Sequence, residues 1–150
     1  MEWKPYLAPT LADETIAARE ELTLGDAVAM ALRSHRAQLG ESQRTYAARR
    51  GWTATQQARL ERHPGSRRLE VIEAALCGTG FRLGVVPDDM ELEVAPESWP
   101  TSELLARDTA GRRLPAHVFT RRVGETPSWH IVRQGPFAPP PQWTWQRPWD

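Results

Sequence analysis

Residues 42–62 read SQRTYAARRGWTATQQARLER, and they decide the fold of this chain. Ser42 and Thr53 are helix N-cap residues, and each precedes a short segment with helical spacing. Gly51 stops the first segment, because glycine accepts the positive φ of a tight turn. Ala47 provides a small side chain where two helices cross closely. The stretch therefore predicts two short helices and a tight turn, a helix-turn-helix unit with helices at 43–50 and 54–62.

Further helices are predicted on both sides of this unit. Thr23 followed by Asp26 resembles a capping box, and apolar residues then keep helical spacing up to Leu39, before Gly40. A fourth helix is predicted at 67–77, and a short acidic helix at 11–22. This acidic helix has too few apolar residues for a core of its own, so it either docks onto the next unit or is partly disordered.

The second half of the chain has the patterns of short strands. Apolar residues alternate in 81–85 and in 90–94 around a Pro-Asp-Asp turn, which predicts a β-hairpin. Two more strands are predicted at 118–123 and 129–133, followed by an extended tail from Pro136. The expected class is α+β: an N-terminal bundle of four or five helices, then a small antiparallel β appendage and a tail rich in tryptophan and proline.

Charge is segregated along the chain although the 19 basic and 19 acidic residues cancel. Residues 33–68 hold nine arginines against Glu41 and Glu61, a net charge of +7. Residues 1–26 and 88–108 are acidic, with −4 and −6, and residues 109–150 carry +4. The +7 block is either a footprint for phosphates or a solvated helical surface.

Several classes of protein are not expected. No apolar run is long enough to cross a membrane, and the first ten residues do not have the pattern of a secretory signal, so a cytoplasmic protein is the default. The single cysteine, Cys77, cannot form an internal disulfide, and the four histidines lack metal-ligand spacing. No series of nucleophile, base and acid is present, so we expect no enzyme, no cofactor and no metal.

Residues 24–86 resemble the Xre/Cro-type helix-turn-helix family of phage repressors and bacterial regulators. The features that carry the resemblance are Ser42-Gln43, Ala47 and Gly51 four residues apart, Thr53, Leu60-Glu61, and then LEVIEAALCGTGFRL at 69–83. The resemblance implies a chain divided into an N-terminal arm at 1–22, a DNA-binding domain at 23–80, the hairpin at 81–95 and a C-terminal appendage at 96–150.

The resemblance also implies roles for individual residues. Contacts with bases are expected from Gln43, Ala54, Thr55, Gln56 and Arg59. Contacts with phosphates are expected from Ser42, Arg44, Arg62, Arg67 and Arg68. Gln56 and Arg59 are the expected direct readers, because glutamine pairs bidentately with adenine and arginine with guanine. Arg36 and Glu61 match a structural ion pair of the family.

The resemblance implies a sequence-specific transcriptional regulator that binds double-stranded DNA as a homodimer. Arg50 and Gln57 depart from the family, which usually has aliphatic core residues there, so we expect both to snorkel or to find polar partners. Two alternatives remain: an antitoxin that represses its own operon, or a protein-interaction adaptor on the same scaffold. The Trp-rich C-terminal region is a dimer or partner surface, an intramolecular packing element or a disordered tail.

Overall fold

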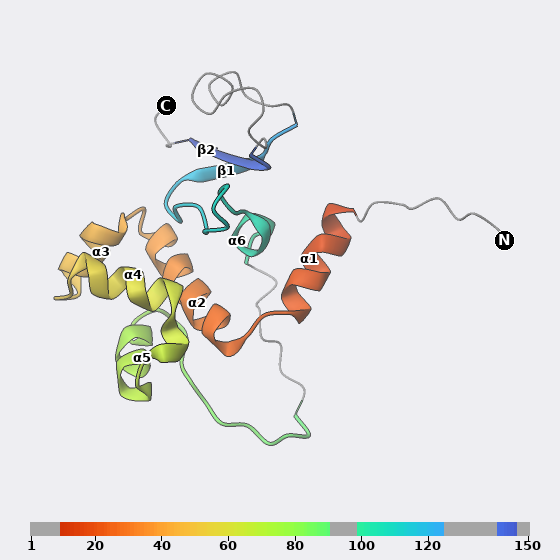
Figure 1. Ribbon diagram of the computed structural model, residues 1–150. Coiled ribbons are helices and arrows are strands. Elements are labelled where there is room, and N and C mark those ends of the chain that lie inside the picture. Colours follow the sequence, from red (N-terminus) through yellow and green to blue (C-terminus); the bar gives the residue numbers. More distant parts are fainter. Residues whose placement is uncertain (1–9, 91–98, 125–140, 147–150) are drawn as a thin grey trace.

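A computed structural model of the chain describes residues 10–90, 99–124 and 141–146 (Figure 1). The elements in these ranges are α1 (Leu11–Glu20), α2 (Leu24–Gln38), α3 (Gln43–Arg49), α4 (Ala54–Arg62), the 3-10 turn η1 (Pro64–Ser66), α5 (Leu69–Leu76), α6 (Thr101–Leu105), β1 (Phe119–Arg122) and β2 (Trp143–Gln146). The fold is therefore α+β, as predicted: a mostly helical N-terminal region followed by a two-stranded antiparallel sheet. No helix in these ranges has the length and apolar composition needed to cross a bilayer.

The helices begin where the capping residues predict. Thr23 caps α2, and the Asp26 side chain accepts a hydrogen bond from the Thr23 backbone N–H, which completes the predicted capping box. Thr53 and Gln56 form the same reciprocal arrangement at the start of α4. An N-cap of this kind contributes about 0.5–2 kcal/mol to stability, so each helix start is determined by residues within one turn.

The core forms where the long helix α2 meets α4 and α5, and it also includes side chains from beyond the helical unit. Its buried members are Val28, Met30, Ala31, Leu32, Leu60, Ile72, Ala75, Leu76, Trp99 and Leu104. Trp99 and Leu104 are each only 4% exposed. Full burial of a large apolar side chain contributes about 1.5–3 kcal/mol, so the chain around α6 is held against the helices by apolar packing.

The helix α1 lies against α6, and its Ala18 packs on the edge of the core (Figure 1). None of its side chains is buried, and Leu11 and Ile16 are 42% and 56% exposed. The Arg19 side chain donates a hydrogen bond of 3.1 Å to the backbone carbonyl of Trp99. The acidic helix is thus docked onto the C-terminal part of the chain.

The sheet joins two segments that are far apart in the sequence. The strand predicted at 118–123 is present as β1, whose Phe119 is paired with Gln146 and whose Arg122 is paired with Trp143. In the described part of the chain, the partner of β1 is β2, which lies in the predicted extended tail. The other strand predicted here, at 129–133, lies outside the described residues.

The hairpin predicted at 81–95 needs a correction, because residues 81–90 form no strand. The turn is present, with the Met90 N–H donating to the Pro87 carbonyl at 3.1 Å. Phe81 and Leu83 pack against the core, and the Phe81 ring lies 5.8 Å from that of Trp99. Alternating burial is therefore present at these two positions, but a strand also needs a hydrogen-bonded neighbour. Residues 91–94 lie outside the described ranges.

Candidate nucleic-acid interface

The helices α3 and α4 pack together as a helix-turn-helix unit. Ala47 of α3 is fully buried, and its carbonyl accepts a hydrogen bond from Trp52 N–H at 2.8 Å across the turn. Gly51 lies in this turn with φ of +70°, a conformation that strains any residue with a Cβ. The small residue and the glycine therefore have the structural roles that their positions predict.

The helix α4, for which base contacts are predicted, has one buried and one exposed face. Gln57, Leu60 and Glu61 are buried against the other helices. The predicted base contacts of α4 form its exposed side, namely Ala54, Thr55, Gln56 and Arg59. The structure thus brings these four residues together on one accessible polar surface.

Two of the predicted base-reading glutamines already make internal hydrogen bonds. The Gln56 side-chain carbonyl accepts from the Thr53 backbone N–H at 2.7 Å, and the Gln43 amide donates to Glu61 at 2.8 Å. Bidentate pairing with adenine uses both the carbonyl and the amino group of a glutamine. Each amide still has a second N–H and a second carbonyl lone pair, so these hydrogen bonds restrict the orientation of both side chains without excluding pairing with adenine. Arg59 is exposed and has no such bond to another described residue.

The predicted phosphate contacts surround this surface but differ in accessibility. Arg44, Arg62 and Arg68 are exposed. Ser42 caps α3 by accepting from the Thr45 N–H at 3.2 Å, and the Nε of Arg67 is buried without an acceptor in the described part of the chain. The exposed arginines are consequently the members of this set that are most available to a polyanion.

A buried polar network ties α2 to α4. Arg36 and Glu61 form a two-pronged ion pair of 2.9 and 3.0 Å, and Gln57 donates to the same carboxylate at 2.8 Å. Burial by itself would raise the pKa of the Glu61 carboxyl. The hydrogen bonds and positive charge of Arg36, together with the hydrogen bonds from Gln43 and Gln57, outweigh the effect of burial, so this pKa lies below its usual value. The structure therefore contains the ion pair that the family resemblance implies, and it gives Gln57 a polar partner.

Arg50, the other position where a polar partner was expected, binds the end of α5. Its guanidinium donates to the Tyr46 hydroxyl at 2.7 Å and to the carbonyls of Ala75 and Cys77 at 2.8 and 3.0 Å. It also lies 4.5 Å above the ring of Trp52, within cation–π range. Arg50 thus satisfies the terminal carbonyls of a helix, and the expectation of polar partners is confirmed for it.

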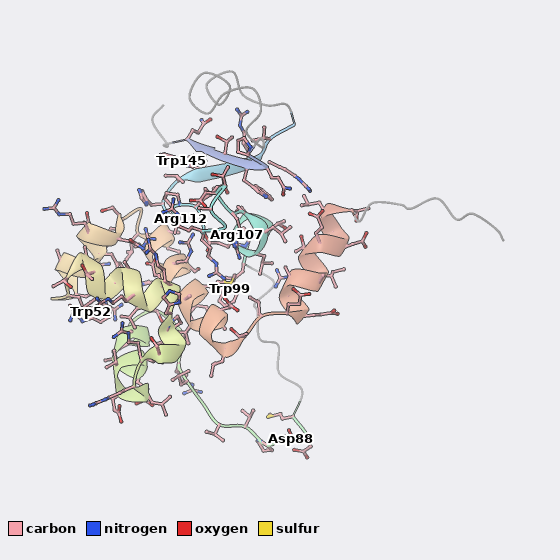
Figure 2. All side chains as sticks on the ribbon, in the orientation of Figure 1. Trp52, Asp88, Trp99, Arg107, Arg112 and Trp145 are labelled. Carbon is pink, nitrogen blue, oxygen red and sulfur yellow. The ribbon has the colours of Figure 1, made fainter. Side chains whose placement is uncertain are left out.

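Basic residues of the C-terminal region face the helical unit, and sequence reasoning missed this arrangement. Arg113 pairs with Asp26 at 3.3 Å, and Arg33 of α2 binds the carboxylate of Glu103 at 2.9 Å. Arg107 and Arg112 lie in the same region between the helices and the sheet (Figure 2). The only available signal was the +4 charge of residues 109–150, which does not locate these side chains.

Comparison of the chain with family models, with curated proteins and with solved structures gives no match. Within the described ranges, no group of three or more His, Cys, Asp or Glu side chains is arranged to hold a metal ion.

Proposed function

We propose that the protein is a cytoplasmic, sequence-specific DNA-binding regulator of transcription. It acts as a homodimer, and each protomer inserts the N-terminal half of α4 into the major groove of one half of a pseudo-palindromic operator. Arg59 and Thr55 read base edges, and exposed arginines around α4 contact phosphates.

The observation that carries this proposal is the division of α4 into two faces. Its buried face is anchored by Leu60 and by the Glu61 network, so the helix has a fixed orientation on α2 and α3. Its opposite face exposes four residues from the first two turns of the helix, and their side chains are short or polar: Ala54, Thr55, Gln56 and Arg59. A rigid helix with such a face fits a major groove, which admits one α-helix.

Fluorescence anisotropy against the promoter of the protein's own gene and a scrambled duplex, over a series of salt concentrations, tests the proposal. We expect binding to the promoter about 10³-fold tighter than to the scrambled duplex. Arg59→Ala should reduce this ratio, since a good bidentate base contact is worth about 1–3 kcal/mol. Arg44→Ala should weaken binding to both duplexes alike and lower the salt slope by about one.

Arg82→Ala is the matched control, because Arg82 is an exposed arginine in the segment between α5 and the Pro87 turn, outside the helix-turn-helix unit. It should leave both affinities unchanged. Equal, weak binding to the two duplexes by the wild-type protein would contradict a sequence-specific regulator.

A protein-interaction adaptor on the same scaffold is the second candidate. It is favoured by the internal hydrogen bonds of Gln43 and Gln56, which engage two of the five predicted base contacts. Such a protein would be indifferent to DNA sequence in the titration above. It would instead co-purify with a partner that is lost when the C-terminal region is altered.

A further inference from the structure

A cavity of about 770 Å³ lies between the helical unit and residues 107–117, with Trp145 of β2 in its wall. Pockets that bind small molecules have volumes of about 300–1,000 Å³, so this one has a suitable size. Six arginines line it: Arg33, Arg36, Arg62, Arg107, Arg112 and Arg113. Figure 2 shows Arg107 and Arg112 on the side of the molecule where Trp145 lies.

The positive charge of this cavity is only partly balanced. Four of the six guanidinium groups have a carboxylate partner, in the pairs Arg33–Glu103 (2.9 Å), Arg36–Glu61 (2.9 Å), Arg112–Asp108 (2.9 Å) and Arg113–Asp26 (3.3 Å). Arg62 and Arg107 form no ion pair with any described residue. Counted over the described residues, the arginines of the cavity therefore carry two positive charges more than their carboxylate partners balance.

Arg107 is the more unusual of the two, because it is half-buried among other arginines. Its guanidinium donates to the carbonyl of Ala106 at 2.9 Å. Burial lowers the pKa of Arg107, and the charges of Arg113 and Arg33 lower it further, against the opposing effect of Glu103 and Asp26. The Nε of Arg113 is also buried without an acceptor among the described residues. An oxyanion in the cavity would stabilise both groups.

We propose that this cavity binds a small phosphate monoester through Arg62 and Arg107, and that the ligand weakens DNA binding. A phosphate monoester carries a charge of about −1.5 to −2 at pH 7, which matches the two guanidinium charges that have no carboxylate partner in the described ranges. Guanidinium groups bind phosphate oxygens in a two-pronged geometry. The indole of Trp145 and the imidazole of His117 supply flat surfaces for the organic part of the ligand.

The effect on DNA rests on the proposed function, and it follows from residues that the two sites share. Arg62, at the end of α4, is an expected phosphate contact, and Gln43, at the start of α3, is an expected base contact. Both side chains line the cavity. A bound phosphate monoester occupies Arg62, so the ligand and DNA compete for this charge. Because coupling is reciprocal, each should weaken the binding of the other by the same factor.

Isothermal titration calorimetry of the full chain without DNA tests the ligand site. The probes are inorganic phosphate and adenosine 5′-monophosphate at constant ionic strength, with adenosine as the uncharged control. We expect at least one phosphate probe to bind with Kd of about 1 mM or below, and adenosine not to bind. Arg107→Gln and Arg62→Gln should each weaken binding about tenfold or more, while Arg82→Gln, outside the cavity, should not.

Circular dichroism shows whether Arg107→Gln has kept the fold, and Arg62→Gln is a second test at an exposed position. The ligand site is overturned if neither phosphate probe binds at about 10 mM, if adenosine binds as tightly as its monophosphate, or if both cavity variants bind like wild type.

A second titration separates this inference from the proposed function. If a phosphate probe binds and depends on Arg107, saturating probe should weaken promoter binding at constant ionic strength. Binding of the probe without any binding of the promoter would retain the ligand site and remove its regulatory role. Loss of DNA affinity in Arg107→Gln, with no binding of either probe, would assign the cavity to a backbone phosphate of DNA and overturn the small ligand.

Discussion

The guanidinium of Arg36 and the carboxylate of Glu61 meet between α2 and α4 at 2.9 Å, with each side chain only 2% exposed. A buried charge is tolerated only where it is paired and hydrogen-bonded, and here Gln43 and Gln57 complete the bonding of the carboxylate. This pair therefore anchors α4 on the long helix α2. Its removal should affect both stability and any binding that depends on the orientation of α4.

Breaking this ion pair from one side should be strongly destabilising. Arg36→Met leaves Glu61 buried with its main charge partner removed, and such a change costs about 3–5 kcal/mol. The double variant Arg36→Met with Glu61→Leu should recover only part of this loss, because it removes both charges but leaves the amides of Gln43 and Gln57 without their acceptor. Urea denaturation monitored by circular dichroism measures the three proteins. Equal stability of Arg36→Met and wild type would show that the pair does not anchor α4.

The lowered pKa of Glu61 predicts a loss of stability in acid. The carboxyl of the unfolded chain titrates near 4.5, and that of the folded protein titrates lower. The stabilisation is therefore fully present above pH 4.5, and it is lost as the pH falls from there through the folded pKa. Urea midpoints measured between pH 7 and pH 3 should fall more steeply for wild type than for the double variant without the ion pair. Parallel curves would contradict this assignment.

Arg50 should not be replaceable by lysine. Its planar guanidinium donates hydrogen bonds to the Tyr46 hydroxyl and to the carbonyls at the end of α5 at the same time. The ammonium group of a lysine cannot reproduce this planar arrangement of donors. We expect Arg50→Lys to lower the free energy of unfolding by about 1–3 kcal/mol. Arg49→Lys is the control, because Arg49 is 49% exposed and its only ion pair in the described chain is with Glu41. Its effect should stay within about 0.5 kcal/mol.

Gly51 should be sensitive to substitution although open space surrounds it. A Cβ at this position meets no atom within 4 Å, but φ of +70° is unfavourable for an L-residue. Gly51→Ala should therefore cost about 1–2 kcal/mol. Gly65→Ala, where the space is equally open and φ lies outside the left-handed region, should cost less. Similar thermal unfolding of the two variants would show that the turn at Gly51 relaxes to another conformation.

Some features could be predicted from the sequence because they depend on neighbouring residues. The caps at Thr23 and Thr53 act within one turn, so the starts of α2 and α4 agree with expectation. The strand expected at 81–85 did not form, because alternating apolar residues indicate a buried face and do not supply a partner strand. The polar positions Arg50 and Gln57 could be recognised as exceptions, but the carbonyls at the end of α5 that Arg50 binds and the Arg36–Glu61 pair that Gln57 joins depend on the packing of other helices.

Helix caps, turn glycines and apolar spacing act over a few residues, so the helix-turn-helix unit, its exposed polar face and the α+β class could be predicted from the sequence alone. The entry of Trp99 and Leu104 into the helical core, which brings Arg107 next to Arg33 and Arg113, is visible only in the folded chain. Apolar burial depends on the area removed from water and not on the separation of residues along the chain, so local patterns do not reveal which distant side chains pack together. This packing holds the C-terminal region against the helices, and the arginine-lined cavity forms where the packing ends.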